Sequence, residues 1–112
     1  MSYQFKGNHY IASFKGIKPI CNFDLKNIVS DALITCGINI LNYQEYIFNN
    51  NAISFCFLLS ESHCSLHSYP EYNSLFIDCF TCGDDFDLNR FHNILLRKLR
   101  PDDYTKQIIE RN

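Results

Sequence analysis

The stretch LLSESHCSLHSYPE, residues 58–71, concentrates side chains capable of chemistry directly after an apolar run. It holds serine hydroxyls, two imidazoles, one thiol and two carboxylates. A catalytic serine needs a base that takes its proton and a group that stabilises the oxyanion. Ser62, His67 and Cys82 are the candidates for such a site. The chain has no GxSxG elbow and no carboxylate placed to complete a triad, so an ordinary serine hydrolase is not favoured.

A zinc site is the second chemistry that these residue types allow. Zinc prefers four nitrogen or sulfur ligands in a tetrahedron. The chain offers His63, Cys64 and His67, together with the CxxC pair of Cys79 and Cys82. However, two histidines four residues apart share a face only on a helix, which the prolines and strand-forming residues here disfavour, and a strand would point the CxxC cysteines to opposite faces. We therefore expect no metal site from this set.

A polar loop with buried cysteines is the third interpretation. Six cysteines in a chain without a secretion signal are better explained as buried thiols, ligands or nucleophiles than as disulfides. Burial accounts for Cys56 and Cys79, which lie in apolar runs. It leaves unexplained why several polar residues crowd together, namely Ser62, His63, Ser65, His67 and Glu71.

Two helices are predicted to flank the strands of this chain. Asp24 is expected to cap the first helix, whose apolar stripe runs from Leu25 to Cys36 and which stops at Gly37. The second helix is predicted from an apolar stripe that ends before Pro101 and comprises Leu88, Phe91, Leu95 and Leu99. Residues 102–112 are expected to form a polar tail.

The strand pattern predicts an α+β fold. Strands are expected at residues 7–14, 38–41, 45–48, 52–59 and 75–81, with a turn at 49–51 and a break at 83–85. The order β-α-β-β-β-β-α with short connections favours a two-layer sandwich, an antiparallel sheet with two helices packed on one face. Strand 52–59 is too apolar for a solvated sheet, so the second face is expected to be covered, and a homodimer would cover it.

Composition limits the function classes. The chain has 112 residues, which fits a single domain, 1–112. A net charge of −2 gives no indication of nucleic-acid binding. No apolar run approaches the ~20 residues that cross a bilayer, so no membrane partner is expected. The N-terminal segment MSYQFKGNHY lacks an apolar signal core, and we expect a cytoplasmic protein.

Residues 61–83 resemble the signature of the prokaryotic S-adenosylmethionine decarboxylase proenzymes. That family reads ESHxSxHTWPE and then DxFTCG, and this chain reads ESHCSLHSYPE and DCFTCG. Upstream, Gly7-x-His9 is similar to the family's G-x-H, and residues 48–54 are similar to its FxPxGxS segment, which gives Phe48 and Ser54. The resemblance covers about residues 7 to 83.

The resemblance implies that the chain cleaves itself between Glu61 and Ser62. The Ser62 hydroxyl would attack the Glu61 carbonyl, and elimination followed by hydrolysis would leave a pyruvoyl group as cofactor on the new N-terminus. The products would be a beta chain, 1–61, and an alpha chain, 62–112. By resemblance, His67 and Ser54 serve this processing.

The resemblance also assigns roles in catalysis. The pyruvoyl group derived from Ser62 would form a Schiff base with the amine of a small amino-acid-type substrate and accept the electrons left when CO₂ departs. Cys82 would donate the proton that quenches the carbanion, Phe48 would stack on adenine, and Glu71 would hold the ribose hydroxyls. The implied activity is S-adenosylmethionine decarboxylation for polyamine (spermidine) synthesis by a homodimer with sites near the subunit boundary.

Four departures from the family pattern leave the substrate open. Ser13 stands in place of an acidic residue, Asn50 and Ala52 replace proline and glycine, and Ser68-Tyr69 replaces Thr-Trp. The fourth departure, Cys79 at the second position of DxFTCG, is harmless. The first three fall around the substrate pocket, whereas the processing residues are kept. An alternative is therefore pyruvoyl-dependent decarboxylation of arginine or ornithine. A non-enzymatic homologue is a further alternative, although intact Glu61, Ser62, His67 and Cys82 speak against it.

Overall fold

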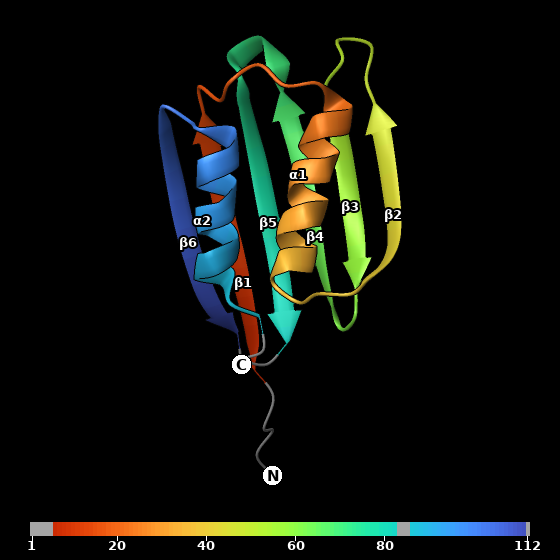
Figure 1. The fold of residues 1–112 in the computed structure, drawn as a ribbon, viewed down its shortest axis with the longest axis vertical. Coiled ribbons are helices and arrows are strands. Elements are labelled where there is room, and N and C mark those ends of the chain that lie inside the picture. The colour runs from red at the N-terminus through yellow and green to blue at the C-terminus, as the bar shows by residue number, and fades with distance from the viewer. Residues whose placement is uncertain (1–5, 83–85, 112) are drawn as a thin grey trace.

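The computed structural model describes residues 6–82 and 86–111 as an antiparallel sheet covered on one face by two helices (Figure 1). The predicted break at 83–85 lies outside the described residues. The strands are β1 (Gly7–Lys15), β2 (Ile40–Ile47), β3 (Ile53–Leu59), β4 (Ser62–Tyr69), β5 (Ser74–Cys82) and β6 (Asp103–Arg111). The helices are α1 (Asn22–Thr35), the 3-10 turn η1 (Pro70–Tyr72) and α2 (Leu88–Leu99).

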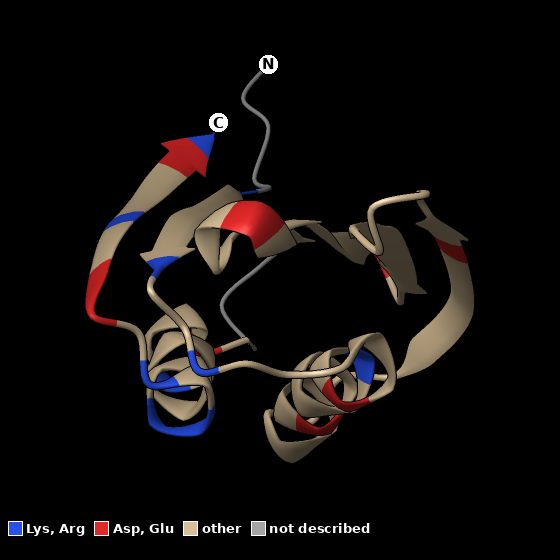
Figure 2. Ribbon diagram, turned by 90° about the horizontal axis from the view of Figure 1, so that it is seen from above, with Lys and Arg blue, Asp and Glu red and all other residues tan. Residues whose placement is uncertain are grey.

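The six strands lie in the order β2-β3-β4-β5-β1-β6, and each neighbouring pair is antiparallel. Both α1 and α2 lie on the same side of the sheet, as the view from above shows (Figure 2). This architecture confirms the predicted fold class. Charged residues are sparse in the central strands: β3 and β4 contain no Asp, Glu, Lys or Arg, and β5 contains only Asp78.

The core lies between the helices and the sheet. Strand side chains alternate between the two faces, so every second residue of β1, β3, β4 and β5 is buried against the helices. The largest fully buried members of this core are Tyr10, Phe14, Phe57, Phe91, Leu33, Ile53, Leu59, Leu75 and Leu95. No helix in residues 6–82 and 86–111 is long and apolar enough to cross a membrane.

The other side of the sheet, here called the open face, carries the remaining alternate residues. It is covered by no helix and exposes large apolar side chains, including Ile11, Leu58, Phe76 and Ile109. The continuous apolar run of β3 is thereby explained, because Phe55, Phe57 and Leu59 are buried while Leu58 lies on the open face.

Predictions for three regions of the chain need correction. The two short strands predicted at 38–41 and 45–48 form the single strand β2, whose pairing with β3 is irregular between Ile40 and Asn42. No strand is predicted between residues 59 and 75, but Ser62–Tyr69 form strand β4. The tail expected after Pro101 is strand β6, which pairs with β1 along its length.

Helix α1 begins earlier than predicted. Its N-cap is Cys21, whose sulfur accepts a hydrogen bond from the Asp24 backbone N–H at 3.4 Å. Asp24 instead lies in the first turn, where its negative charge interacts favourably with the helix dipole. The predicted stop at Gly37 is confirmed, since that residue adopts a φ of 83°.

Candidate active site

The Glu61–Ser62 peptide bond lies at the tip of the β3–β4 hairpin. Leu59 pairs with Ser62, so Ser60 and Glu61 form a two-residue turn. Glu61 adopts a φ of 61°, a left-handed conformation that costs an L-residue roughly 1–2 kcal/mol. The Ser62 hydroxyl donates a hydrogen bond to the Ser60 carbonyl oxygen at 3.3 Å. The candidate cleavage site is therefore an exposed, strained turn.

Cys82 lies at the same end of the sheet as this turn. His63 pairs with Phe80, so extending the register places Ser62 opposite Thr81 and brings Cys82 beside Glu61. Cys82 is exposed, whereas Thr81 is buried. Strand alternation directs the Ser62 side chain to the helix-covered side and the Cys82 thiol to the open face. The two side chains thus share one end of the sheet and lie on opposite faces of the uncleaved chain.

A second group of predicted site residues gathers at the other end of the open face. Ser54 pairs directly with His67 across β3 and β4. The His67 imidazole contacts the Phe48 ring at a centroid distance of 5.7 Å and the Tyr69 ring at 4.8 Å. A surface hollow of about 430 Å³ is lined by Phe48, Asn49, Asn50, Ala52, His67, Tyr69 and Glu71.

Asn50, one of the residues that depart from the family pattern, contacts the carboxylate of Glu71. Its side-chain amide donates a hydrogen bond to Glu71 Oε2 at 3.2 Å. The same Asn50 side chain accepts a hydrogen bond from the Ala52 backbone N–H at 3.1 Å. The turn after β2 therefore fixes an amide against one oxygen of the predicted ribose-binding carboxylate.

One chain does not bring all the predicted site residues together. Ser62 and His67 are five residues apart on β4, which separates their Cα atoms by about 17 Å at ~3.4 Å per residue. In Figure 1 the β3–β4 turn and the end of β5 lie at the lower end of the sheet, whereas η1 and the β2–β3 turn lie at the upper end. Glu61, Ser62 and Cys82 form one group, and Phe48, Ser54, His67 and Glu71 form the other.

The zinc set considered from the sequence cannot gather around one ion. Cys64 and Cys79 are fully buried on the helix-covered side, while His63 and His67 lie on the open face. A hydrogen bond with Cys79 and burial raise the pKa of the Cys64 thiol well above its usual range, so it remains protonated. The expectation that Cys56 is buried is wrong: β3 directs this residue to the open face, where it is exposed.

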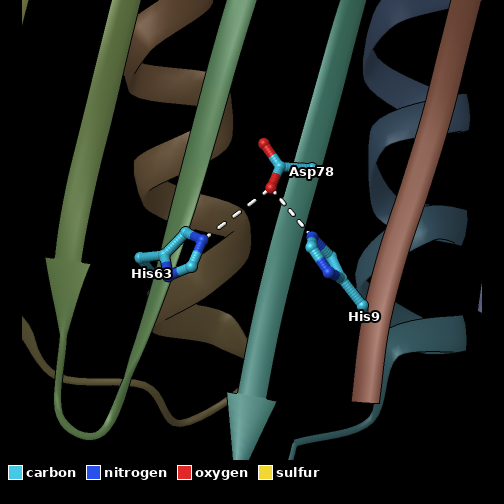
Figure 3. A group of neighbouring side chains, drawn as sticks. All are labelled: His9, His63 and Asp78. Carbon is cyan, nitrogen blue, oxygen red and sulfur yellow. Dashed lines mark hydrogen bonds and ion pairs between the residues drawn. The ribbon is translucent and has the colours of Figure 1, made fainter. Parts of the chain in front are cut away.

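The structure reveals one cluster to which sequence reasoning gave no role. His9, His63 and Asp78, from three adjacent strands, converge on the open face (Figure 3). Asp78 Oδ2 lies 3.0 Å from His9 Nε2 and 3.8 Å from His63 Nε2. The signal available in the sequence was the two-residue alternation of β4 and β5, but the cluster also needs the pairing of β1 with β5, which the sequence does not specify.

Comparison with known proteins decides the family. A family model described as S-adenosylmethionine decarboxylase matches residues 8–112. The chain belongs to the S-adenosylmethionine decarboxylase family. This membership confirms the resemblance seen in residues 61–83 and extends it to the C-terminal strand β6.

Two relatives and one solved structure illustrate the similarity. The chain is 32% identical to an S-adenosylmethionine decarboxylase proenzyme of Brevibacillus brevis, over 97% of this chain and 85% of that protein. It is 26% identical to an arginine decarboxylase proenzyme of Ignicoccus hospitalis, over 95% of this chain and 77% of that protein. The crystal structure of adenosylmethionine decarboxylase from Aquifex aeolicus superposes with a TM-score of 0.86 at 25% identity, over 98% of this chain and 93% of that one.

Proposed function

We propose that this chain is a proenzyme that cleaves itself between Glu61 and Ser62 and then decarboxylates S-adenosylmethionine for polyamine synthesis. The observation that carries the proposal is the position of this bond, in a strained hairpin turn beside the strand end that holds Cys82. Family membership and the name proenzyme given to the relatives support a processed precursor.

Cleavage converts the Glu61–Ser62 amide into two chain ends. The Ser62 oxygen attacks the Glu61 carbonyl carbon, and the amide nitrogen leaves as the free amine of an ester. Elimination breaks the ester C–O bond, which releases a Glu61 carboxylate and leaves dehydroalanine at position 62. Water then replaces the nitrogen, which departs as ammonia, and a pyruvoyl group remains. Opening the turn also relieves the left-handed Glu61 conformation, a gain of roughly 1–2 kcal/mol.

The residues around the turn fit a pyruvoyl group at position 62. Once the bond is broken, residue 62 is a chain end at the start of β4 and can turn from the helix-covered side toward the open face. When present, the pyruvoyl group supplies a sink for the electrons left by the departing CO₂. Cys82, exposed on the adjacent strand, is placed to donate the proton that completes the product.

A second copy of the chain supplies the groups that one copy keeps apart. His67 and Ser54 lie about 17 Å from the bond they are proposed to process, by the strand rise of ~3.4 Å per residue. Two open faces packed about a two-fold axis that runs across the strands would place each Ser62 end over the partner's His67 end. The exposed apolar side chains of the open face, among them Leu58 and Phe76, would be buried by this packing.

Substrate binding is assigned to the hollow beside His67. Phe48 offers a ring on which an adenine can stack, and the Glu71 carboxylate can accept hydrogen bonds from ribose hydroxyls. The volume of about 430 Å³ lies within the range of ~300–1,000 Å³ that ligand pockets span. These features favour a nucleoside-bearing substrate.

One observation favours a basic amino acid as the second candidate substrate. The Asn50 amide donates a hydrogen bond to Glu71 Oε2. A carboxylate with one oxygen already hydrogen-bonded is less suited to bind two ribose hydroxyls. Arginine and ornithine share the α-amine, the carboxylate and a distal positive charge with S-adenosylmethionine.

Release of labelled CO₂ from carboxyl-labelled S-adenosylmethionine, arginine and ornithine, measured side by side on mature protein, separates the candidates. We expect release from S-adenosylmethionine well above the other two. Release from arginine or ornithine alone would overturn the substrate and leave the cleavage chemistry standing. Release from none of the three by cleaved protein would refute the decarboxylase assignment.

A further inference from the structure

The cluster of His9, His63 and Asp78 brings three potential metal ligands together on the open face. The ligand nitrogen and oxygen atoms all lie within 4.8 Å of one another. Figure 3 shows the two imidazoles approaching the Asp78 carboxylate from the strands on either side of β5. Asp78 is the only acidic residue in β3, β4 and β5, so its position between two histidines is not part of a general charged surface.

The spacing of the three atoms is close to that of a transition-metal site. In a tetrahedral zinc centre with bonds of 2.0–2.1 Å, neighbouring ligand atoms lie about 3.3 Å apart. The distances from Asp78 Oδ2 are 3.0 Å to His9 Nε2 and 3.8 Å to His63 Nε2, which bracket this value. The third distance, between the ligand nitrogens of the two imidazoles, is at most 4.8 Å. In the single chain the His63 side chain is 43% exposed and can adjust this distance.

Neighbouring side chains hold Asp78 and the two imidazoles in position. The Ser65 hydroxyl donates a hydrogen bond to Asp78 Oδ1 and so fixes the carboxylate, leaving Oδ2 directed at the histidines. The Phe80 ring packs on both imidazoles, at centroid distances of 5.7 Å to His9 and 5.9 Å to His63. Partners of this kind orient first-sphere ligands and raise metal affinity.

One neighbour opposes a bound cation. Arg111 Nη1 lies 3.5 Å from His9 Nδ1. A metal on Nε2 of a neutral imidazole requires the proton on Nδ1, so the guanidinium must move away when metal binds. Arg111 is exposed on the edge strand β6, but its guanidinium also lies over the Phe80 ring, 5.3 Å from the centroid, so the movement gives up this contact too.

We propose that His9, His63 and Asp78 bind one divalent transition-metal ion per chain, of which Zn²⁺ is the representative, with the remaining coordination positions filled by water. Two imidazoles and a carboxylate suit zinc and its first-row neighbours and do not suit magnesium or calcium, which prefer oxygen ligands. This inference does not depend on the proposed decarboxylase activity.

Isothermal titration of metal-free wild-type protein with Zn²⁺ tests the site directly. We expect one ion per chain, and a loss of affinity of more than tenfold in His9→Ala and in Asp78→Asn. Ser65→Ala, which removes only the supporting hydrogen bond, should lower affinity by ~10-fold or more. Arg111→Gln should raise affinity, an effect that a merely structural role of this residue would not produce.

Matched controls separate this site from adventitious binding. His67→Ala removes another open-face histidine, and Cys56→Ala and Cys82→Ala remove exposed thiols; all three should keep wild-type zinc affinity. The cobalt-substituted wild type should show d–d absorption without the charge-transfer band that a thiolate ligand gives. Absence of binding to wild type, unchanged affinity in correctly folded Asp78→Asn, or loss of binding in Cys82→Ala would each overturn the proposal.

Discussion

At the scale of single residues, Cys82 differs from the buried cysteines in its position. Its thiol is exposed at the end of β5, beside the turn that carries Glu61 and Ser62. Cys64 and Cys79 are buried in the core and cannot contact a substrate. Of these three thiols, only Cys82 is placed for the proposed role of proton donor to the substrate carbanion.

Replacement of Cys82 by alanine should lower the rate of decarboxylation by ~10²-fold or more, because a positioned general acid contributes about that factor. The measurement is kcat of fully cleaved protein, which separates catalysis from maturation. Cys56→Ala, which removes an exposed thiol from the middle of the open face, is the matched control and should retain wild-type kcat. Equal kcat in the Cys82→Ala and wild-type proteins would remove Cys82 from the reaction.

At the scale of the element, the β3–β4 hairpin stores strain at one residue. Glu61 is left-handed at the second position of a two-residue turn, a conformation that glycine adopts without penalty. Asn73, which follows η1 with a φ of 50°, is also left-handed, but asparagine tolerates this conformation better than glutamate.

The change Glu61→Gly, made in the uncleavable Ser62→Ala background, should raise the free energy of unfolding by about 1 kcal/mol. Asn73→Gly in the same background is the matched control and should give a smaller gain. Chemical denaturation of the three proteins measures both differences. A destabilised Glu61→Gly protein would show that the turn is not strained.

The packing of α2 against β1 buries a titratable histidine. His92 is 2% exposed, and its Nδ1 lies 2.6 Å from the Tyr10 hydroxyl. Burial raises the pKa of Tyr10 well above its ordinary value, so the hydroxyl stays protonated and donates to His92. Burial, with a smaller contribution from Lys106, lowers the pKa of His92 from 6.5 to about 4. The fold therefore requires the neutral imidazole.

Stability should fall between pH 6.5 and pH 4 through this histidine. The unfolded chain binds a proton on His92 below its pKa of 6.5, whereas the folded chain does not until about pH 4. The stabilisation is thus complete above pH 6.5 and is lost as the pH falls, by on the order of 3 kcal/mol. Denaturation of the Ser62→Ala protein across this range measures the loss, and adding His92→Gln should flatten it. An equal slope in both proteins would contradict this assignment.

The hydrophobic pattern specified some elements of this fold and not others. Residues 52–59 could be predicted because they form a continuous apolar run, and the helix from Leu88 to Leu99 because burial of one face imposes a period. Strand β4 was missed because its buried positions include Cys64 and Ser68, which give little apolar alternation. Strand β6 was missed because all nine of its residues are exposed at the sheet edge, so no residue type marks it.

At the scale of the whole molecule, the strand register separates residues that are close in sequence. Ser54, Ser62, His67 and Cys82 lie within one short stretch of sequence, which suggests a single site. The antiparallel pairing of β3, β4 and β5 instead divides them between the two ends of the sheet. The spacing of the motif residues does not predict this division, because the division arises from the extended conformation of the strands and not from residue type.

Processing across the dimer predicts complementation between two inactive chains. Ser62→Ala lacks the serine at the proposed cleavage site, and His67→Ala lacks the histidine proposed to process it. In a hybrid dimer made by co-expression with different tags, the His67→Ala chain should be cleaved, because its Ser62 end meets the His67 of the partner. Electrophoresis of the purified hybrid measures the fragments.

The control hybrid pairs His67→Ala with the double variant Ser62→Ala, His67→Ala and should stay intact. A His67→Ala chain that remains whole beside Ser62→Ala, or that is cleaved equally well in the control hybrid, would show that processing does not use the partner's histidine.

Intact-mass spectrometry of the purified wild-type chain tests the self-cleavage on which the proposed function rests. We predict two fragments, residues 1–61 and residues 62–112, the second lighter than a serine-terminated fragment by the mass of ammonia and blocked to Edman sequencing. Ser62→Ala should give one full-length mass. A well-folded wild-type protein that remains entirely full-length after prolonged incubation would contradict the proenzyme assignment.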